Sequence, residues 1–259
     1  MRQSWIDLTF LHWPYDPAIV RPLVPRELEL DLHDGAAWVG LVPFTIVDLT
    51  RPGWPAAPWL SRFHETNVRT YVMDREGRPG VWFFSLDAAR LAAVLAARAG
   101  YALPYFWSRM RVECDGRRAR YRSRRIPPLR GMSEIEMQIG EEIAKPDELA
   151  DFLTARWRLF AYRFGRVLRA EIEHPPWPLQ RAEVVGLKET LITAAGLPAP
   201  RGEPLAHFSP RVDVLVGACV AQASWPVQGR LRRLHRSGDR CHYNVSMTMN
   251  CSNFPAAVR

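Results

Sequence analysis

Four polar residues at alternate positions of one segment could form the wall of a binding cavity. Residues 63–72, Phe-His-Glu-Thr-Asn-Val-Arg-Thr-Tyr-Val, have the β-branched and aromatic composition of a strand. Successive strand side chains point to opposite faces, so every second residue shares a face. The residues on one face are Glu65, Asn67, Arg69 and Tyr71. This set could bind and orient a small polar ligand; the alternative is a solvent-facing strand with an incidental ion pair.

The next strand-like segment favours the cavity over the solvent-facing alternative. Residues 80–87, Gly-Val-Trp-Phe-Phe-Ser-Leu-Asp, are apolar on both faces, which is typical of a strand buried inside a sheet. A buried neighbour would exclude water from the polar face of residues 63–72. We therefore add Trp82 and Phe84 to the predicted ligand-binding wall.

A further candidate is Arg21, which lies between apolar residues and two prolines in the segment 18–25. An arginine in such surroundings either extends its head group to water or binds an anion through paired N–H donors. The residue types alone leave both alternatives open.

The remaining reactive side chains form no known catalytic or metal-binding pattern. The cysteines are Cys114, Cys219, Cys241 and Cys251. They contain no Cys-x-x-Cys pair, which argues against a zinc ribbon or a disulfide scaffold. The histidines His12, His64 and His174 also lack the short spacings of metal ligands. We therefore expect neither a metal nor another cofactor.

The formal net charge of +8 does not by itself indicate a nucleic-acid partner. Six arginines stand against one aspartate from residue 217 onward, so the excess is concentrated at the C-terminus. Within Arg117–Arg125, alternate arginines would share one strand face. That face predicts either a solvated surface that discourages edge pairing or a phosphate-binding surface. Few aromatic residues are interleaved with the arginines, so nucleic acid is not the expected partner.

The N-terminal sequence lacks the basic and then apolar layout of a signal peptide. No stretch approaches the roughly 18 uncharged apolar residues of a membrane-spanning helix. We therefore expect a cytoplasmic protein without a membrane partner.

The elements that must position these residues are mostly strands. Strand patterns cover residues 27–32, 36–47, 67–73, 81–86, 109–114, 117–124, 132–139, 167–172, 182–187 and 212–216. Helical patterns cover residues 88–99, with Asp87 as the N-cap, and 146–157. Many short strands and few helices predict a mainly β (α+β) fold, a closed or partly closed β-barrel with peripheral helices.

The apolar periodicity disappears after Val216. We therefore expect one barrel domain over residues 1–216 and a basic, disordered tail over residues 217–259. Dimerisation through sheet edges is left open.

Seven short blocks of the chain resemble the uncharacterised family known as DUF2071, or YqjF-like. They are residues 11–13, 21–28, 34–40, 63–71, 80–88, 103–105 and 174–179. The resemblance covers essentially residues 1–216. Residues 20–25 also resemble the Leu-Arg-Ala-Leu-Val-Pro stretch of acetoacetate decarboxylase. The resemblance implies the acetoacetate decarboxylase-like fold, a β-barrel with an internal cavity.

The same resemblance implies that one activity is absent. Acetoacetate decarboxylase forms a Schiff base through a lysine whose pKa is lowered by an adjacent cation and by desolvation. Its lysine pair follows a Phe-Pro dipeptide that aligns with Leu103-Pro104, and the next residue in this chain is Tyr105. A phenol cannot form an iminium. Lys145 and Lys188, the two lysines of the chain, are expected to be exposed.

By position, the resemblance carries over two residues. Arg21 matches the family arginine that contacts the substrate carboxylate, and Glu65 lies in the region of the cavity glutamate. We therefore predict a pocket for a small carboxylate that is clamped by Arg21 and oriented by Glu65 and Tyr105, which would be the catalytic pair of any reaction. One alternative is a lysine-independent enzyme, a lyase or hydrolase of small oxo or hydroxy acids. Another is a nucleic-acid-binding module that uses Arg117–Arg125.

Overall fold

The computed structural model describes residues 1–50 and 61–221. In this part of the chain, the strands form a single 13-stranded sheet. The strands are β1 (Arg2–Tyr15), β2 (Glu29–Leu30), β3 (Ala37–Thr50), β4 (Phe63–Met73), β5 (Pro79–Ala88), β6 (Tyr105–Cys114), β7 (Arg118–Arg125), β8 (Met132–Glu142), β9 (Arg158–Arg163), β10 (Arg166–Glu173), β11 (Gln180–Glu189), β12 (Leu205–Val216) and β13 (Val220–Ala221). The helices are α1 (Pro17–Val20), the 3-10 helix η1 (Arg21–Leu23), α2 (Leu91–Tyr101), α3 (Glu148–Thr154) and α4 (Leu191–Ala194).

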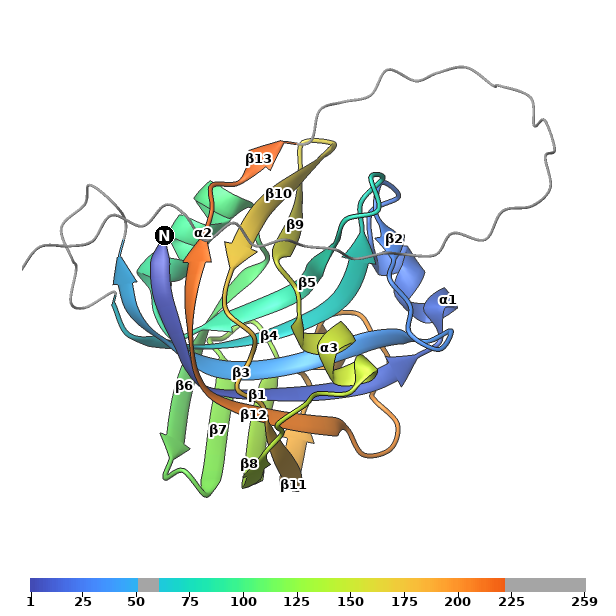
Figure 1. The fold of residues 1–259 in the computed structure, drawn as a ribbon. Helices are drawn as coiled ribbons and strands as arrows, with labels where there is room; N and C mark the ends of the chain where they lie inside the picture. Colours follow the sequence, from blue (N-terminus) through green and yellow to red (C-terminus); the bar gives the residue numbers. More distant parts are fainter. Residues whose placement is uncertain (51–60, 222–259) are drawn as a thin grey trace, which may run out of the picture. The chain divides into compact units, whose positions relative to one another are not determined.

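The sheet closes on itself twice. One ring runs through β5, β6, β7, β8, β11, β12, β1, β3 and β4, and β4 bonds back to β5. A second ring uses β9 and β10 to connect β5 with β12. The two rings share β12, β1, β3, β4 and β5, the long strands that cross the middle of Figure 1. The expected mainly β architecture, a closed sheet with few helices, is confirmed.

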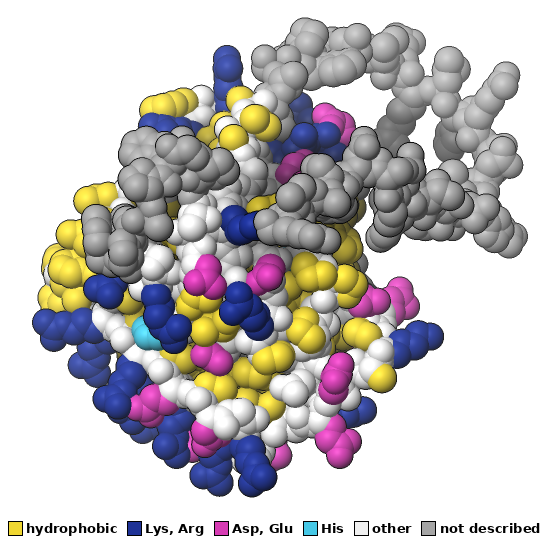
Figure 2. Space-filling view, turned by 60° about the vertical axis from the view of Figure 1, so that its left-hand side comes forward, with side chains coloured by type: hydrophobic (Ala, Val, Ile, Leu, Met, Phe, Trp, Pro, Cys, Tyr) yellow, Lys and Arg dark blue, Asp and Glu magenta, His cyan; other side chains and the backbone are white. Residues whose placement is uncertain are grey.

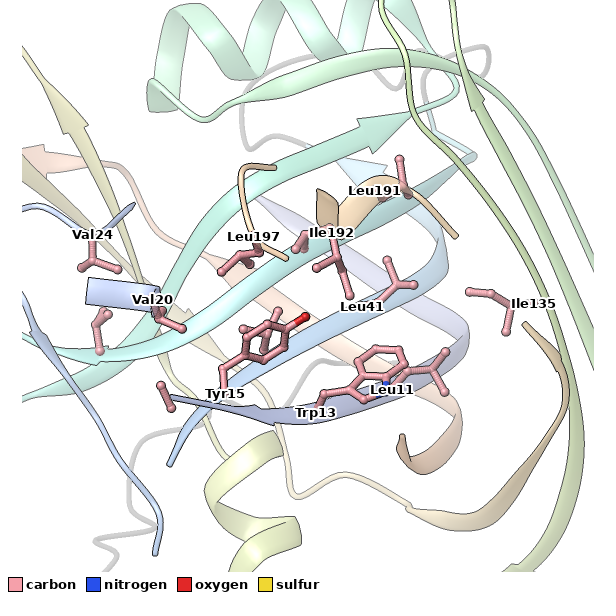
Figure 3. Packing of buried hydrophobic residues seen from close by; sticks show 14 of the residues in the cluster. Leu11, Trp13, Tyr15, Val20, Val24, Leu41, Ile135, Leu191, Ile192 and Leu197 are labelled. Atoms are coloured by element: carbon pink, nitrogen blue, oxygen red, sulfur yellow. The ribbon is translucent and has the colours of Figure 1, made fainter. Parts of the chain in front are cut away.

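The shared strands have a different apolar cluster on each face. On β5, Trp82 and Phe84 pack against a cluster that contains Tyr121 and Met137 of β7 and β8. Val81 and Phe83 belong to a second cluster, with residues of β9, β10 and β12. Figure 3 shows part of the first cluster, in which Trp13 and Leu11 of β1 lie among side chains from several other elements. Burial of each large side chain contributes about 1.5–3 kcal/mol to folding.

The structure corrects the expected helix boundaries. Strand β5 continues to Ala88, and α2 begins only at Leu91, with Arg90 as its N-cap. Asp87 is not a helix cap, because its carboxylate is paired with Arg125, with 2.9 Å between Oδ1 and Nη2. Helix α3 is also shorter than expected, and its N-cap is Asp147.

The sequence patterns do not predict strands β1 and β9. Strand β1 nevertheless pairs with both β3 and β12 at the centre of the sheet. β13 lies in the expected tail, where Val220 pairs with Arg169 of β10. The remainder of that expected tail, from residue 222, lies outside the described residues. No helix within the described ranges is long and apolar enough to cross a membrane.

Candidate functional site

A cavity of about 600 Å³ lies against one face of the shared strands. Its wall is formed by side chains from β1, β3, β4 and β5 and also from α2, β6, β9 and β10. Most of the wall is apolar. The charged and polar side chains of the wall are Gln3, Glu65, Asn67, Arg69, Tyr101, Tyr105, Thr154, Arg156 and His174.

Strand β4 supplies the polar stripe of this wall. Glu65, Asn67 and Arg69 alternate along the strand, and all three are buried and line the cavity. Their backbone pairs with β3 on one side and with β5 on the other, so neither edge of the strand is open at these positions. Strand alternation therefore places three of the four residues of the predicted polar face on the cavity wall.

Glu65 and Tyr105 form a hydrogen-bonded pair inside the cavity. Tyr105 lies at the start of β6, where it pairs with Leu86 of β5, and its phenol donates to Oε2 of Glu65 at 2.7 Å. The Asn67 side chain also hydrogen-bonds to Glu65. Burial raises the pKa of Glu65 to about 7, and the same burial raises the pKa of Tyr105 well above its usual range. At neutral pH the carboxyl group can therefore hold or release a proton, whereas the phenol stays a donor.

Arg69 is a buried cation without a counter-charge. Arg69 is only 8% exposed, and none of the described carboxylates forms an ion pair with its guanidinium. One guanidinium nitrogen, Nη2, donates to the carbonyl oxygen of Leu153 at 3.2 Å, and Nε has no partner among the described residues. The guanidinium also lies 5.4 Å from the ring centre of Phe10. A buried, unpaired guanidinium is costly unless an anion binds to it.

Tyr71, the fourth residue of the predicted face, lies behind Arg69 and not on the cavity wall. Its hydroxyl donates to the Leu153 carbonyl oxygen at 2.7 Å and accepts a weak hydrogen bond from Arg69 Nη2 at 3.4 Å. It also lies 2.6 Å from His12 Nε2. Since the phenol proton points to Leu153, the imidazole must donate through Nε2. Burial and the nearby Arg69 lower the pKa of His12, which keeps the ring neutral.

The structure does not bring Arg21 to the cavity. Its guanidinium donates to the backbone carbonyl oxygens of Val24, Pro25 and Leu28, with 2.6 Å between Nη1 and the Leu28 oxygen. The arginine thereby closes the loop that follows η1. The expectation that Arg21 clamps a carboxylate is not met by this placement.

Trp82 and Phe84 also lie away from the cavity. Both pack against the cluster on the opposite face of β5, whereas their neighbours Val81 and Phe83 line the cavity. The expected strand is correct, but the two assigned side chains point to the wrong face. Because β5 is apolar on both faces, its sequence pattern cannot show which face meets the ligand.

Comparison with known proteins places the chain in a family. Residues 2–213 match the model of DUF2071, which is described as an uncharacterized conserved protein. The chain belongs to the DUF2071 family. It is 39% identical over 217 residues to the uncharacterized protein YqjF of Bacillus subtilis strain 168, an alignment that covers 83% of this chain and 89% of YqjF.

Solved structures of other proteins have a fold similar to that of this DUF2071 chain. The enduracididine biosynthesis enzyme MppR, in its complex with pyruvate, superposes with a TM-score of 0.63 at 14% identity, covering 85% of this chain and 89% of that chain. Acetoacetate decarboxylase from Legionella pneumophila gives a TM-score of 0.60 at 13% identity, covering 85% and 88% of the two chains.

Neither lysine of this DUF2071 chain lines the described cavity wall. Lys145 lies before α3 in a different surface hollow, and Lys188 is part of β11. Among the described residues, no three histidine, cysteine or acidic side chains are grouped as metal ligands. His64 instead hydrogen-bonds to Thr45, and His174 lies 3.2 Å from the Arg156 carbonyl oxygen.

Sequence reasoning misses Arg156, a second arginine on the cavity wall. It follows α3, and its guanidinium pairs with Asp31 and lies over the rings of Tyr71 and Phe152 at 4.9 and 4.3 Å. Its charge is therefore neutralised within the protein, unlike that of Arg69. No local pattern marks Arg156, because Asp31 is 125 residues away in the sequence.

The alternating arginines of β7 lie on an exposed face, as expected. Arg118, Arg120, Arg122 and Arg124 are all exposed. Strand β8 places glutamates beside them, so that Arg120 pairs with Glu136 at 2.8 Å and Arg122 lies opposite Glu134. Figure 2 shows acidic side chains among the Lys and Arg side chains in the lower left of the view. Interleaved charges of both signs favour a solvated strand face over a phosphate-binding surface.

Proposed function

We propose that this protein binds a small organic carboxylate in the cavity, with Arg69 as the anion-binding residue. The observation that carries the proposal is the buried Arg69 guanidinium, which faces the cavity without a carboxylate partner among the described residues. A ligand carboxylate would supply the missing charge and accept hydrogen bonds from the free N–H groups. The pyruvate complex of MppR, a protein of the same fold, supports a carboxylate ligand.

Glu65 and Tyr105 orient the rest of the ligand. The protonated carboxyl group can donate to a carbonyl oxygen, and the ionised group can accept from a hydroxyl. Asn67 hydrogen-bonds to Glu65 and helps to hold that carboxyl group in place. An oxo or hydroxy group on the ligand would therefore find a donor or an acceptor at Glu65, according to the protonation of the carboxyl group.

Schiff-base decarboxylation is not part of this proposal. Tyr105 lies where the resemblance places the lysine pair, and both lysines of the chain lie away from the cavity wall. A carbonyl compound in the cavity thus meets no lysine side chain of the described wall; the Met1 amino group, also at this wall, donates to the Val216 carbonyl oxygen at 2.6 Å.

A second candidate function is a lysine-independent enzyme, a lyase or hydrolase of small oxo or hydroxy acids. The pKa of Glu65, raised to about 7, supports this candidate, since a general acid or base works best when its pKa is near the ambient pH. In that reaction Glu65 would transfer the proton, and Tyr105 would hold the carboxyl group in place.

The test is a binding titration of a carboxylate panel by calorimetry, with each acid compared with its neutral amide. We expect the parent protein to bind one or more of the acids, and Arg69→Gln to bind the same acids about 10- to 100-fold more weakly. This loss corresponds to a charge-assisted hydrogen bond of about 1.5–3 kcal/mol. Arg120→Gln, on the exposed face of β7, is the matched control and should bind as the parent does. Thermal unfolding verifies that both variants fold. Unchanged affinity of every bound acid in folded Arg69→Gln would refute the proposal.

The enzyme alternative is tested by incubating the same acids with the protein and following their consumption by NMR. Turnover that disappears in Glu65→Gln while binding persists would support the enzyme. Binding without turnover for every acid in the panel would leave the binding protein as the better account.

A further inference from the structure

The size of the cavity exceeds what a three-carbon acid needs. Its volume of about 600 Å³ lies within the range of about 300–1,000 Å³ that pockets for drug-sized ligands occupy. A pyruvate-sized molecule bound at Arg69 would leave most of this space unfilled. Unfilled apolar space forfeits the contacts that a larger ligand would make.

Polar and apolar groups are segregated on the cavity wall. The polar stripe follows β4 and Tyr105, whereas β3, β5, β9 and β10 contribute apolar side chains. These include Phe44, Phe83, Leu86, Leu159 and Ile172. A ligand that satisfies both regions carries its charge at one end and an apolar body at the other.

Helix α2 contributes only small side chains over most of the face that it turns to the cavity. Ala93, Ala96, Ala97 and Gly100 line the wall at the spacing of one helix face. Leu91, Val94 and Leu95 of the same helix are not part of the wall, whereas Tyr101, at the C-terminal end of the helix, is. The helix therefore borders the cavity without filling it.

The charges on the wall suit one carboxylate and not two. Of the two arginines on the described wall, Arg156 is already paired with Asp31, which leaves Arg69. The Met1 ammonium group, also at the wall, already donates to the Val216 carbonyl oxygen at 2.6 Å. A second ligand carboxylate without one of these cations would have to lie among apolar side chains or near the Glu65 carboxyl group. Burial of an unpaired charge or repulsion between like charges would weaken binding of a dicarboxylate.

We infer that the ligand is an amphipathic monocarboxylate, with its carboxylate on Arg69 and an alkyl or aryl body against the apolar walls of β5, β9, β10 and α2. This inference rests on the proposed function and narrows it to a ligand class. The unpaired buried arginine defines one end of the ligand, and the apolar volume defines the other.

The experiment compares unbranched acids from acetate to decanoate, below their micelle concentrations, by calorimetry. Each added methylene should tighten binding about fourfold, which corresponds to about 0.8 kcal/mol per buried CH₂. Octanedioate should bind at least tenfold more weakly than octanoate. If acetate and pyruvate bind as tightly as octanoate, the inference is wrong and the proposed function stands. If no acid in the series binds, both fail.

A pair of variants on one helix tests where the apolar body lies. Ala97→Phe places a ring on the cavity face of α2, whereas Ala92→Phe adds the same ring on the exposed side of that helix, away from the wall. We expect Ala97→Phe to weaken octanoate at least tenfold and to leave acetate binding unchanged. Ala92→Phe should bind both acids as the parent does. Equal octanoate affinity in the two folded variants would overturn the placement of the apolar body.

Discussion

Tyr105 donates a hydrogen bond of 2.7 Å to Glu65 across strand β5, which lies between the strands that carry the two residues. The bond holds a buried carboxyl group in a fixed position on the cavity wall. Because burial raises the pKa of Glu65 to about 7, the group changes its charge near neutral pH. Stability and ligand binding should both depend on pH through this residue.

Glu65→Gln is expected to stabilise the protein above pH 7. The pKa of Glu65 rises from 4.5 in an exposed state to about 7 in the fold, so the native state binds the proton more tightly than the unfolded state. Its contribution is most favourable below pH 4.5 and is lost as the pH rises through 7. The loss amounts to about 3 kcal/mol, from about 1.36 kcal/mol per pKa unit. Glutamine keeps an acceptor for Tyr105 and carries no charge.

Thermal unfolding from pH 5 to pH 8.5 measures this effect. The variant should unfold at a higher temperature than the parent at pH 8.5, and the difference should shrink towards pH 5. Glu136→Gln is the control, because the pKa of this exposed carboxyl group is lowered by its hydrogen bond to Arg120. A constant difference between Glu65→Gln and the parent across the whole range would show that the Glu65 pKa is not raised.

Tyr71→Phe should both destabilise the fold and weaken carboxylate binding. The change removes the hydroxyl that connects His12, Arg69 and the Leu153 carbonyl group. The His12 Nε2–H group would become a buried donor without a partner, which costs about 1–3 kcal/mol of folding free energy. Urea denaturation can measure this loss. Arg69 would also lose one of its two contacts and bind anions less tightly. Tyr162→Phe, at an exposed position of β9, should change neither property.

The double variant His12→Phe with Tyr71→Phe tests whether the two side chains stabilise the fold together or independently. It removes the orphaned imidazole donor together with its partner, so its cost should be smaller than the sum of the two single changes. Additive costs would indicate that His12 and Tyr71 are not coupled.

Loss of the buried Asp87–Arg125 ion pair should lower the free energy of unfolding far more than loss of the exposed Arg120–Glu136 pair. Asp87→Ala leaves the Arg125 guanidinium buried and unpaired, which costs about 3–5 kcal/mol. Arg120→Ala breaks the contact with Glu136 on the opposite, exposed face of β7 and should change stability little. Equilibrium denaturation of the two variants gives the comparison; similar midpoints would contradict the buried pairing.

Treatment with a β-oxo acid and borohydride should leave both lysines unmodified. Lys145 and Lys188 lie outside the cavity wall, so neither amine has the dry surroundings that activate a Schiff-base lysine. Intact-mass measurement checks this, with acetoacetate decarboxylase as the positive control. A stoichiometric adduct on either lysine would show that a covalent mechanism survives.

The polar half of the site could be predicted from the sequence, because strand alternation decides it. Glu65, Asn67 and Arg69 share a face by spacing alone, and the cavity lies on that face. The proximity of Tyr105 to Glu65 depends on a parallel pairing between β5 and β6, which no local pattern encodes. The resemblance to a known family supplied Tyr105 instead.

The expectations that the structure corrects depend on contacts that residue types and spacing do not show. Arg21 stands among apolar residues, but its partners are backbone carbonyl groups, which the residue types of a loop do not reveal. The mainly β class follows from composition and turn spacing, whereas β1 and β9 are central through distant pairings. Asp87 has the spacing of a helix cap, and only the tertiary structure shows Arg125 beside it.

One face of strand β5 packs against a core cluster, and its other face borders both the second cluster and the cavity. Positions 81 and 83 could be resized to admit differently shaped molecules, but Val81 and Phe83 are themselves buried, so such changes would also alter stability. Positions 82 and 84 do not reach the cavity, so changes there would alter stability without reshaping the binding space.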